Sequence, residues 1–247
     1  MFWNRKRTQK QITWTAPGGE YDILANKVLE AEHTLIAGTT GCGKTTFLRS
    51  VIQAALVKEA PSEVRFILID PKRFEMKAYK HLPHVLRYAN NEQDIADALR
   101  QAVTIMEARA DMIDRGGSSC DFCDIYVVVD ELNDLMICSF AREMKHNIQR
   151  IITLGRAMKV HMVCCTQNPN RATIPANIVS CYTCRIGLHC LSAIESRQIV
   201  GIKGCETLPK HGEAIAIFDG EIGRYVLPYI PEHGIDDLIN YWIAQAA

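Results

Sequence analysis

One stretch of the sequence decides the fold of this chain: Leu35-Ile36-Ala37-Gly38-Thr39-Thr40-Gly41-Cys42-Gly43-Lys44-Thr45-Thr46. It begins with apolar residues typical of a buried strand, passes through closely spaced glycines, and ends in lysine and threonine before a helical pattern. This order is typical of a phosphate-binding loop between a strand and a helix. Glycines let backbone N–H groups turn toward a phosphate, and the following helix adds the positive end of its dipole.

The loop predicts an ATP site with a bound Mg²⁺ ion. We expect Lys44 to reach the β- and γ-phosphates and the Thr45 hydroxyl to ligate the metal. The alternative is a glycine-rich turn with an incidental lysine, which the position between strand and helix disfavours. The residues expected to hold the nucleotide are Gly38, Thr39, Thr40, Gly41, Cys42, Gly43, Lys44, Thr45 and Thr46.

Apolar patterns on both sides of the loop predict an α/β fold. Helical spacing runs from the loop to Pro61, from Asn90 to Gly117, and near residues 148–154 and 194–199. Alternating strands and helices predict a mostly parallel central sheet with helices on both faces. Buried strands are expected near residues 35–37, 65–70, 125–130, 161–166, 184–188, 214–218 and 225–227.

Length and composition predict one domain. The chain has 247 residues with 48% hydrophobic content, enough for one sizeable core. We expect an N-terminal extension over residues 1–30 and the α/β domain over residues 31–247. Lys plus Arg number 28, as do Asp plus Glu, so nucleic-acid binding needs a local patch or several subunits.

The sequence favours a cytoplasmic protein. Its first residues lack the apolar core of a signal peptide, and no run approaches the roughly 18 apolar residues of a membrane span. Ten cysteines in such a chain favour reduced thiols. The pairs Cys120-x-x-Cys123 and Cys181-x-x-Cys184 leave zinc binding as an alternative, although the gap between them exceeds the ~15 to 20 residues of compact zinc ribbons.

Polar residues close two of the predicted strands. Asp130 and Glu131 end a strand of aliphatic residues, and Gln167 ends the next one. Such strand ends bind ligands in open α/β folds, so we expect Asp130 to hold Mg²⁺ and Glu131 to polarise the attacking water. Gln167 is expected to sense the γ-phosphate. The alternative, surface polar residues after core strands, is disfavoured by the loop upstream.

An arginine is also expected to act at the site. Arg156 in Gly155-Arg156-Ala157 could enter a neighbouring subunit's site and stabilise transition-state charge. Arg185 and Arg197 compete for this role, and a single arginine is more often solvated or ion-paired.

Together these motifs resemble the motor domain of FtsK/SpoIIIE-type DNA translocases, in the FtsK-HerA superfamily of P-loop ATPases. The resemblance covers roughly residues 30 to 230. It implies a RecA-like fold, a homo-hexameric ring with ATP sites between subunits, and double-stranded DNA in the pore, bound without sequence specificity. The motifs are 35–41, Ile69-Asp70-Pro71-Lys72, Val128-Val129-Asp130-Glu131-Leu132, Gly155-Arg156-Ala157, Cys165-Thr166-Gln167 and Ser196-Arg197.

The sequence departs from the family pattern at several points. Cys42 stands where the family usually has serine, and Asn168-Pro169-Asn170 replaces a segment that usually carries arginine. A membrane-spanning N-terminus, a long linker and a C-terminal winged-helix module are not recognisable. The compact motor is therefore more similar to those of mobile elements, in which conjugative transfer uses an ATPase to pump DNA beside membrane-bound transfer machinery.

The resulting hypothesis is an ATP-dependent DNA translocase motor. The family's pore loops direct attention to Arg197, Lys203, Lys210 and Arg224 as DNA contacts, with a ring multiplying their charge. A second basic stretch is formed by Lys72, Arg73, Lys77, Lys80 and Arg87. The alternatives are a related ring ATPase that energises protein secretion (type VII-like) and a nucleotide-binding adaptor without turnover. A positioned base such as Glu131 argues against the adaptor.

Overall fold

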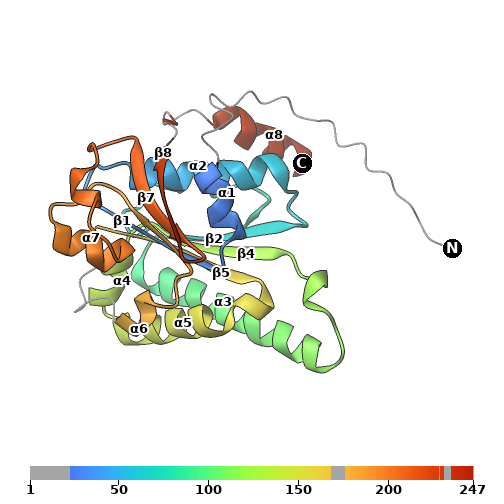
Figure 1. Ribbon diagram of the computed structural model, residues 1–247. Coiled ribbons are helices and arrows are strands. Elements are labelled where there is room, and N and C mark those ends of the chain that lie inside the picture. The colour runs from blue at the N-terminus through green and yellow to red at the C-terminus, as the bar shows by residue number, and fades with distance from the viewer. Residues whose placement is uncertain (1–22, 168–175, 228, 231–234, 247) are drawn as a thin grey trace.

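The computed structural model describes residues 23–167, 176–227, 229–230 and 235–246. These residues form one eight-stranded sheet with the order β3-β2-β4-β5-β1-β6-β7-β8 (Figure 1). The first six strands of the chain pair in parallel, whereas β7 is antiparallel to β6 and β8 is antiparallel to β7. The prediction of a mostly parallel sheet is confirmed.

The elements follow one another in the alternating order that the apolar patterns indicate. The strands are β1 His33–Ala37, β2 Val64–Ile69, β3 Val85–Ala89, β4 Asp124–Val129, β5 Val160–Thr166, β6 Cys184–Gly187, β7 Glu213–Phe218 and β8 Glu221–Val226. The helices are α1 Ile23–Glu30, α2 Lys44–Lys58, α3 Glu92–Asp114, α4 Leu132–Ile137, α5 Ala141–Leu154, α6 Ala176–Val179, α7 Ala193–Val200 and α8 Asp236–Ala246. Short 3₁₀ turns are η1 Lys77–Tyr79, η2 Ser119–Asp121, η3 Arg156–Met158 and η4 Cys205–Thr207.

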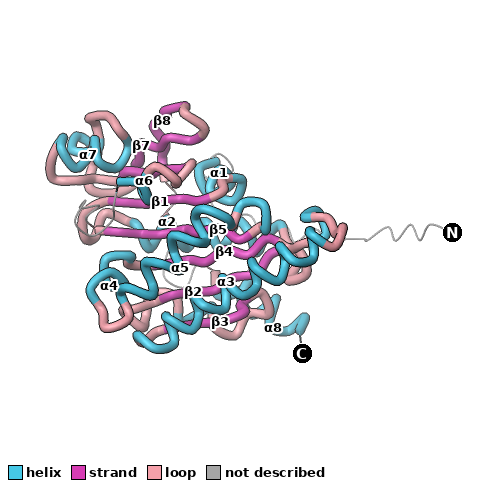
Figure 2. The backbone as a smooth tube through the Cα atoms, turned by 90° about the horizontal axis from the view of Figure 1, so that it is seen from below, coloured by secondary structure: helices cyan, strands magenta, loops and turns pink. Residues whose placement is uncertain are grey.

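Helices cover both faces of the sheet, as predicted. On one face α1, α2 and α8 pack in a core that includes Leu24, Phe47 and Leu238. On the other face α3, α4 and α5 pack in a core that includes Leu99 and Ile148, and Figure 2 shows α3 and α5 running across the strands. The central strands β1 and β4 are buried on both faces over nearly their whole length, which explains the runs Leu35-Ile36-Ala37 and Val127-Val128-Val129.

Local signals explain where the long helices begin and end. The Asn91 side chain accepts the N–H of Asp94 at 3.0 Å and caps α3, while Gly116 follows its end with a φ of 91°. Gly43, with a φ of 102°, stands at the start of α2. Both boundaries agree with the predicted helices.

Several elements have weak signals in the sequence. The edge strand β3 is only partly buried, and α4 has six residues, too few for a clear helical period. Strand β8 begins at Glu221, four residues before the predicted start at residue 225. The reason is that Asp219 and Gly220, both with positive φ, form the turn, and the first residues of this edge strand are exposed.

The predicted N-terminal extension includes α1, which packs against α2 and the sheet. Leu24, Ala25 and Val28 are buried in the core, and the Tyr126 hydroxyl donates to the carbonyl of Leu29 at 2.6 Å. We therefore propose that the domain begins before α1 and not at residue 31.

The described residues contain neither a membrane-spanning helix nor a cluster of metal ligands. No helix among them is both long enough and apolar enough to cross a membrane. Nor do they contain a group of three or more His, Cys, Asp or Glu side chains arranged to hold a metal ion. Of the cysteine pairs considered for zinc, Cys120 is exposed on η2, whereas Cys184 is buried in β6.

A buried histidine begins the central strand β1. His33 is 2% exposed, and its Nδ1 accepts the N–H of Met162 at 3.1 Å. Its Nε2 has no hydrogen-bond partner within the described part of the chain. Burial, followed by the nearby His161, lowers the pKa of His33 from 6.5 to about 4, so the ring is neutral in the folded protein at neutral pH.

We expect the stability of the domain to fall in mild acid. The unfolded chain binds a proton at His33 below pH 6.5, whereas the folded chain does so only near pH 4. The contribution of neutral His33 to the free energy of unfolding is therefore full above pH 6.5 and is lost as the pH falls toward 4. The loss from this group is about 2 kcal/mol between pH 7 and pH 5. Urea denaturation at both pH values measures it.

His33→Gln keeps an acceptor for Met162 and removes the titration, so its pH dependence should be smaller than that of the natural protein. The exposed His81→Gln is the matched control. Equal pH dependence in all three proteins would contradict the assignment to His33.

Candidate nucleotide-binding and catalytic site

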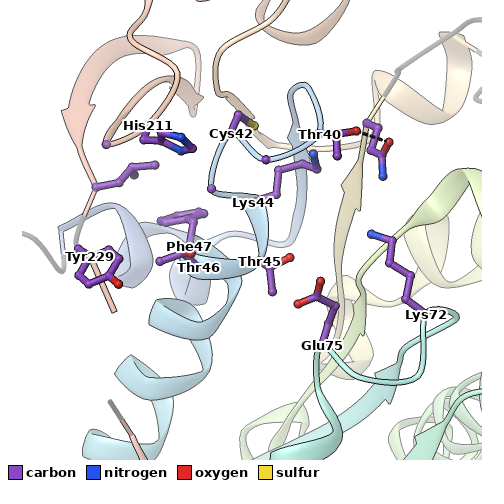
Figure 3. Close-up of a pocket in the computed structure, with 15 residues that line it drawn as sticks. Thr40, Cys42, Lys44, Thr45, Thr46, Phe47, Lys72, Glu75, His211 and Tyr229 are labelled. Carbon is purple, nitrogen blue, oxygen red and sulfur yellow. Dashed lines mark hydrogen bonds between the residues drawn. The ribbon is translucent and has the colours of Figure 1, made fainter. Parts of the chain in front are cut away.

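The predicted site residues meet at the carboxyl edge of three adjacent strands. β4, β5 and β1 are neighbours in the sheet, so Glu131, Gln167 and the loop after β1 come together there. A pocket of about 770 Å³ opens at this edge (Figure 3). It is lined by Thr40, Gly41, Cys42, Gly43, Lys44, Thr45, Thr46, Phe47, Lys72, Glu75, Gln167, His211, Gly212, Leu227 and Tyr229.

The phosphate-binding loop needs its glycines for two reasons. Gly41 and Gly43 adopt φ values of 71° and 102°, the left-handed region that other residues rarely occupy. Gly38 is closely packed, because a Cβ there would lie 2.7 Å from Cys42 Sγ and 2.9 Å from the Leu188 Cβ. The loop is also held from outside, where the Thr39 N–H donates to the His189 carbonyl at 2.9 Å.

Lys44 lies at the first turn of α2 and is 7% exposed. Its ammonium donates to the carbonyls of Gly38 at 2.7 Å and Thr39 at 2.9 Å. The Lys44 ammonium therefore lies at the phosphate-binding loop, where we expect it to contact the phosphates.

The residues predicted to bind Mg²⁺ lie side by side. The Thr45 hydroxyl is 3.4 Å from Asp130 Oδ1, and the carboxylate is 1% exposed. The other oxygen, Oδ2, lies 3.0 Å from the ammonium of Lys72. A hydroxyl and a buried carboxylate at a loop that leaves room for phosphates are the hard oxygen donors that Mg²⁺ prefers, so these residues fit the metal.

Glu131 is held in place through one of its two carboxylate oxygens. Its Oε1 accepts the N–H groups of Asn133 and Gln167, both at 3.3 Å. Its Oε2 is buried and has no hydrogen-bond partner among the described residues. Burial raises the pKa of Glu131, and the two N–H donors oppose that shift.

Gln167 connects the end of β5 to the loop. The Thr40 hydroxyl donates to Gln167 Oε1 at 2.8 Å, while the Gln167 backbone contacts Glu131. Gln167, which was predicted to sense the γ-phosphate, thus contacts the phosphate-binding loop through its side chain and the predicted base through its backbone N–H.

Arg156 does not join this pocket. It lies on η3, is 76% exposed and forms an ion pair with Glu32, which precedes β1. Because the phosphate-binding loop follows β1, Arg156 lies at the opposite edge of the sheet from the site of its own chain. The competing Arg185 is partly buried in β6, and Arg197 is exposed on α7.

The basic residues considered for DNA binding fall into different environments. Lys72 lines the pocket, and Arg87 lies 3.6 Å from both Asp94 and Asp97. Arg224 pairs with Glu213 across β7 and β8. Exposed cations are Arg73, Lys77, Lys80, Arg197, Lys203 and Lys210. The departure at Asn168-Pro169-Asn170 lies outside the described residues.

Sequence reasoning missed part of the pocket. Phe47 and Tyr229 lie on one side with His211, while Lys72 and Glu75 lie on the opposite side (Figure 3), and Leu227 also lines the pocket. Only Lys72 had a signal, since it follows Asp70 at the carboxyl end of a buried strand. Asp70 itself is fully buried and accepts bonds from the Arg73 and Met76 N–H groups and the Tyr88 hydroxyl, at 3.0, 3.1 and 3.0 Å.

Known proteins are similar to this chain in sequence. The profile of the FtsK/SpoIIIE family matches residues 18–120. The chain is 30% identical over 247 residues to the DNA translocase FtsK of Staphylococcus epidermidis, covering 91% of this chain and 31% of that protein. It is 33% identical over 243 residues to FtsK of Chlorobaculum tepidum, covering 89% of this chain and 30% of the relative. The chain thus spans about a third of the length of these relatives.

Solved structures agree on the fold. The conjugation coupling protein TcpA of pCW3, determined with ATPγS, superimposes with a TM-score of 0.75 at 18% identity, covering 87% of this chain and 64% of that one. The type VII secretion ATPase EccC of Thermomonospora curvata gives a TM-score of 0.71 at 24% identity, covering 87% and 28%. The predicted P-loop ATPase fold is confirmed.

We expect Gly38→Ala to damage the phosphate-binding loop. The added Cβ would crowd Cys42, Leu188 and the His189 carbonyl, so the loop must shift, at a cost of about 1–3 kcal/mol. Chemical denaturation measures the stability, and fluorescence titration measures ATPγS affinity, which should fall as well.

Gly116→Ala is the control. Gly116, unlike Gly38, has a positive φ, and a Cβ added there would meet open space away from the pocket. This variant should lose stability and keep nucleotide affinity. Natural stability and affinity in Gly38→Ala would show that the loop has room for a side chain.

Proposed function

The chain carries a motor domain of the FtsK/SpoIIIE type, and we propose that it hydrolyses ATP to move DNA through a ring of its own copies. The observation that carries this proposal is that Lys44, Thr45 and Gln167 line one pocket. Asp130 lies behind it against the Thr45 hydroxyl, and Glu131 accepts the backbone N–H of Gln167. These residues supply phosphate binding, metal binding, a base and a sensor, the parts that phosphoryl transfer to water requires.

Binding of Mg·ATP uses the loop and the edge of β4. Gly38 to Thr46 surround the phosphates, Lys44 turns its ammonium from the loop carbonyls to the β- and γ-phosphates, and Thr45 and Asp130 hold the metal. Mg²⁺ bound there neutralises charge on the β- and γ-phosphates. The apolar side of the pocket, with Phe47, Leu227 and Tyr229, accommodates the base.

Glu131 acts as the general base. Its backbone contacts fix Oε1, which leaves Oε2 to accept a hydrogen bond from the attacking water and then its proton. Gln167 orients the same water and contacts the γ-phosphate, and its bond to Thr40 links that contact to the loop.

A neighbouring subunit supplies the positive charge that stabilises the remaining negative charge on the transition state. Arg156 lies at the opposite edge of the sheet from its own site and is exposed, so in a homo-hexameric ring it is available to a second copy. Its partner Glu32 is on the surface of the same chain, and an exposed pair of this kind costs little to separate.

DNA is held by backbone contacts without sequence specificity. The chain has no net charge, so a ring must gather a few exposed cations from each copy, and Arg197, Lys203 and Lys210 near α7 are available. We further propose double-stranded DNA as the substrate, cytoplasmic location, and conjugative or mobile-element transfer beside membrane-bound machinery. The similarity to a conjugation coupling protein supports this setting.

Energising protein secretion is the second candidate function. The similarity to a type VII secretion ATPase favours it, because that protein shares the fold and covers the same part of this chain. A nucleotide-binding adaptor is disfavoured by the fixed position of Glu131.

Two substitutions test the nucleotide site. Lys44→Ala should weaken ATPγS binding by about tenfold or more, because it removes charge-assisted bonds to the phosphates. Glu131→Gln should bind ATP normally and hydrolyse it about a hundredfold more slowly, since the amide cannot take the proton. Binding is measured by fluorescence titration and turnover by phosphate release. Hydrolysis at the natural rate by Glu131→Gln would refute its role as base.

DNA stimulation tests the motor. Steady-state ATPase activity should rise with long double-stranded DNA, and the rise should be much larger at about 50 mM than at about 200 mM salt, because backbone contacts release counterions. Lys44→Ala serves as the blank. Activity that ignores DNA at both salt concentrations would favour the secretion function.

A further inference from the structure

Lys72 occupies a position in the pocket that the proposed mechanism does not yet use. It belongs to the loop after β2, and its side chain reaches toward the phosphate-binding loop from the far wall (Figure 3). Its ammonium lies 3.0 Å from Asp130 Oδ2, and the side chain is 27% exposed. The lysine therefore faces the site and is not a solvated cation of the basic stretch.

The backbone that carries Lys72 is firmly held. Asp70, two residues before it, is fully buried and accepts hydrogen bonds from Arg73 and Met76 on the other side of Lys72, while Tyr88 donates to the same carboxylate. This arrangement closes the loop around Asp70. The position of the Lys72 backbone is thus set by the fold, and only the side chain needs to adjust when a ligand binds.

Lys72 and Thr45 face different oxygens of Asp130. Oδ1 faces the Thr45 hydroxyl at 3.4 Å, whereas Oδ2 faces Lys72. An ammonium has three N–H donors, and among the described residues the ion pair of Lys72 is with Asp130 alone. Two donors are therefore available to a ligand in the pocket without breaking the contact to Asp130.

The shape of the pocket indicates which part of the nucleotide they meet. Phe47, His211 and Tyr229 lie on one side, where a base fits, and Lys72 lies on the opposite side beyond Thr45 (Figure 3). Since the metal binds between the β- and γ-phosphates, a group beyond the Thr45–Asp130 pair is nearest to the terminal phosphate.

Charge favours the same placement. Asp130 and Glu131 are both nearly fully buried beside the expected position of the terminal phosphate, and anions in such a site repel one another unless cations lie between them. Lys44 lies on the side of the phosphate-binding loop. Lys72 supplies a second positive charge on the side of the acids. Its ion pair with Asp130 keeps the ammonium close to both Asp130 and Glu131.

We propose that Lys72 bridges Asp130 and the γ-phosphate, and that it thereby makes the site distinguish ATP from ADP. This inference rests on the proposed nucleotide site and adds a residue in direct contact with the substrate. When the γ-phosphate leaves, the ammonium keeps its contact with Asp130, so ADP binds without it.

The test compares ATPγS and ADP binding to the full chain by competition against a fluorescent ADP. Lys72→Met removes the charge and should weaken ATPγS binding by about tenfold or more while leaving ADP binding unchanged. Lys72→Arg keeps the charge and should retain most of the preference. Lys77→Met removes an exposed lysine from the same segment and should change neither affinity.

Lys72→Met leaves Asp130 without its ion pair, and this variant could fail to fold. Lys72→Gln is therefore measured as well, because the glutamine amide can still donate a hydrogen bond to the Asp130 carboxylate. It should lose ATPγS affinity in the same selective way. Equal effects on both nucleotides, or no effect, would overturn the proposal, as would unchanged nucleotide binding with weaker DNA binding.

The outcome is separable from that of the proposed function. If Lys44→Ala binds both nucleotides normally, the nucleotide site itself is wrong. If Lys44→Ala fails to bind and Lys72→Met and Lys72→Gln keep the natural ratio of ATPγS to ADP affinity, only the role of Lys72 is wrong. DNA stimulation is measured independently of both.

Discussion

The parallel pairing of β4, β5 and β1 is the constraint on which the rest of the structure depends. Parallel strands end at a common edge, and these three are neighbours in the sheet, so the segments that follow them meet. The phosphate-binding loop, Glu131 and Gln167 are brought together by this pairing alone. The cores on both faces keep the strands in register, because continuous aliphatic strands must be covered on two sides.

The same edge concentrates charge in a place with little water. Asp70, Asp130 and Glu131 are almost fully buried, and each is compensated in a different way. Asp70 accepts bonds from backbone N–H groups and a tyrosine hydroxyl, and Asp130 forms an ion pair with Lys72. Glu131 accepts two N–H groups, and its other oxygen has no hydrogen-bond partner in the part of the chain that the structure describes. Since a buried acid without compensation is costly, the differences between these environments separate support, charge balance and base chemistry.

Much of this arrangement could be predicted from the sequence. The loop, the apolar strands and the capped helix α3 have local signals, and Asp130 and Glu131 follow a strand whose composition shows that it is buried. Short or partly exposed elements such as α4, β3 and the start of β8 could not be placed well, because their apolar residues are too few to show a period. The pocket is also lined by His211, Leu227 and Tyr229, which no motif connects to the loop.

The sequence by itself determined the chemistry available: a phosphate-binding loop, two acids and an amide at strand ends, within an alternating α/β pattern. Only the tertiary structure decided which of these groups share a site. It placed Lys72 on Asp130, Thr40 on Gln167, and Arg156 at the opposite edge beside Glu32. The physical reason is that spacing along the chain encodes local conformation, whereas contacts between distant segments depend on the order of strands and the packing between them.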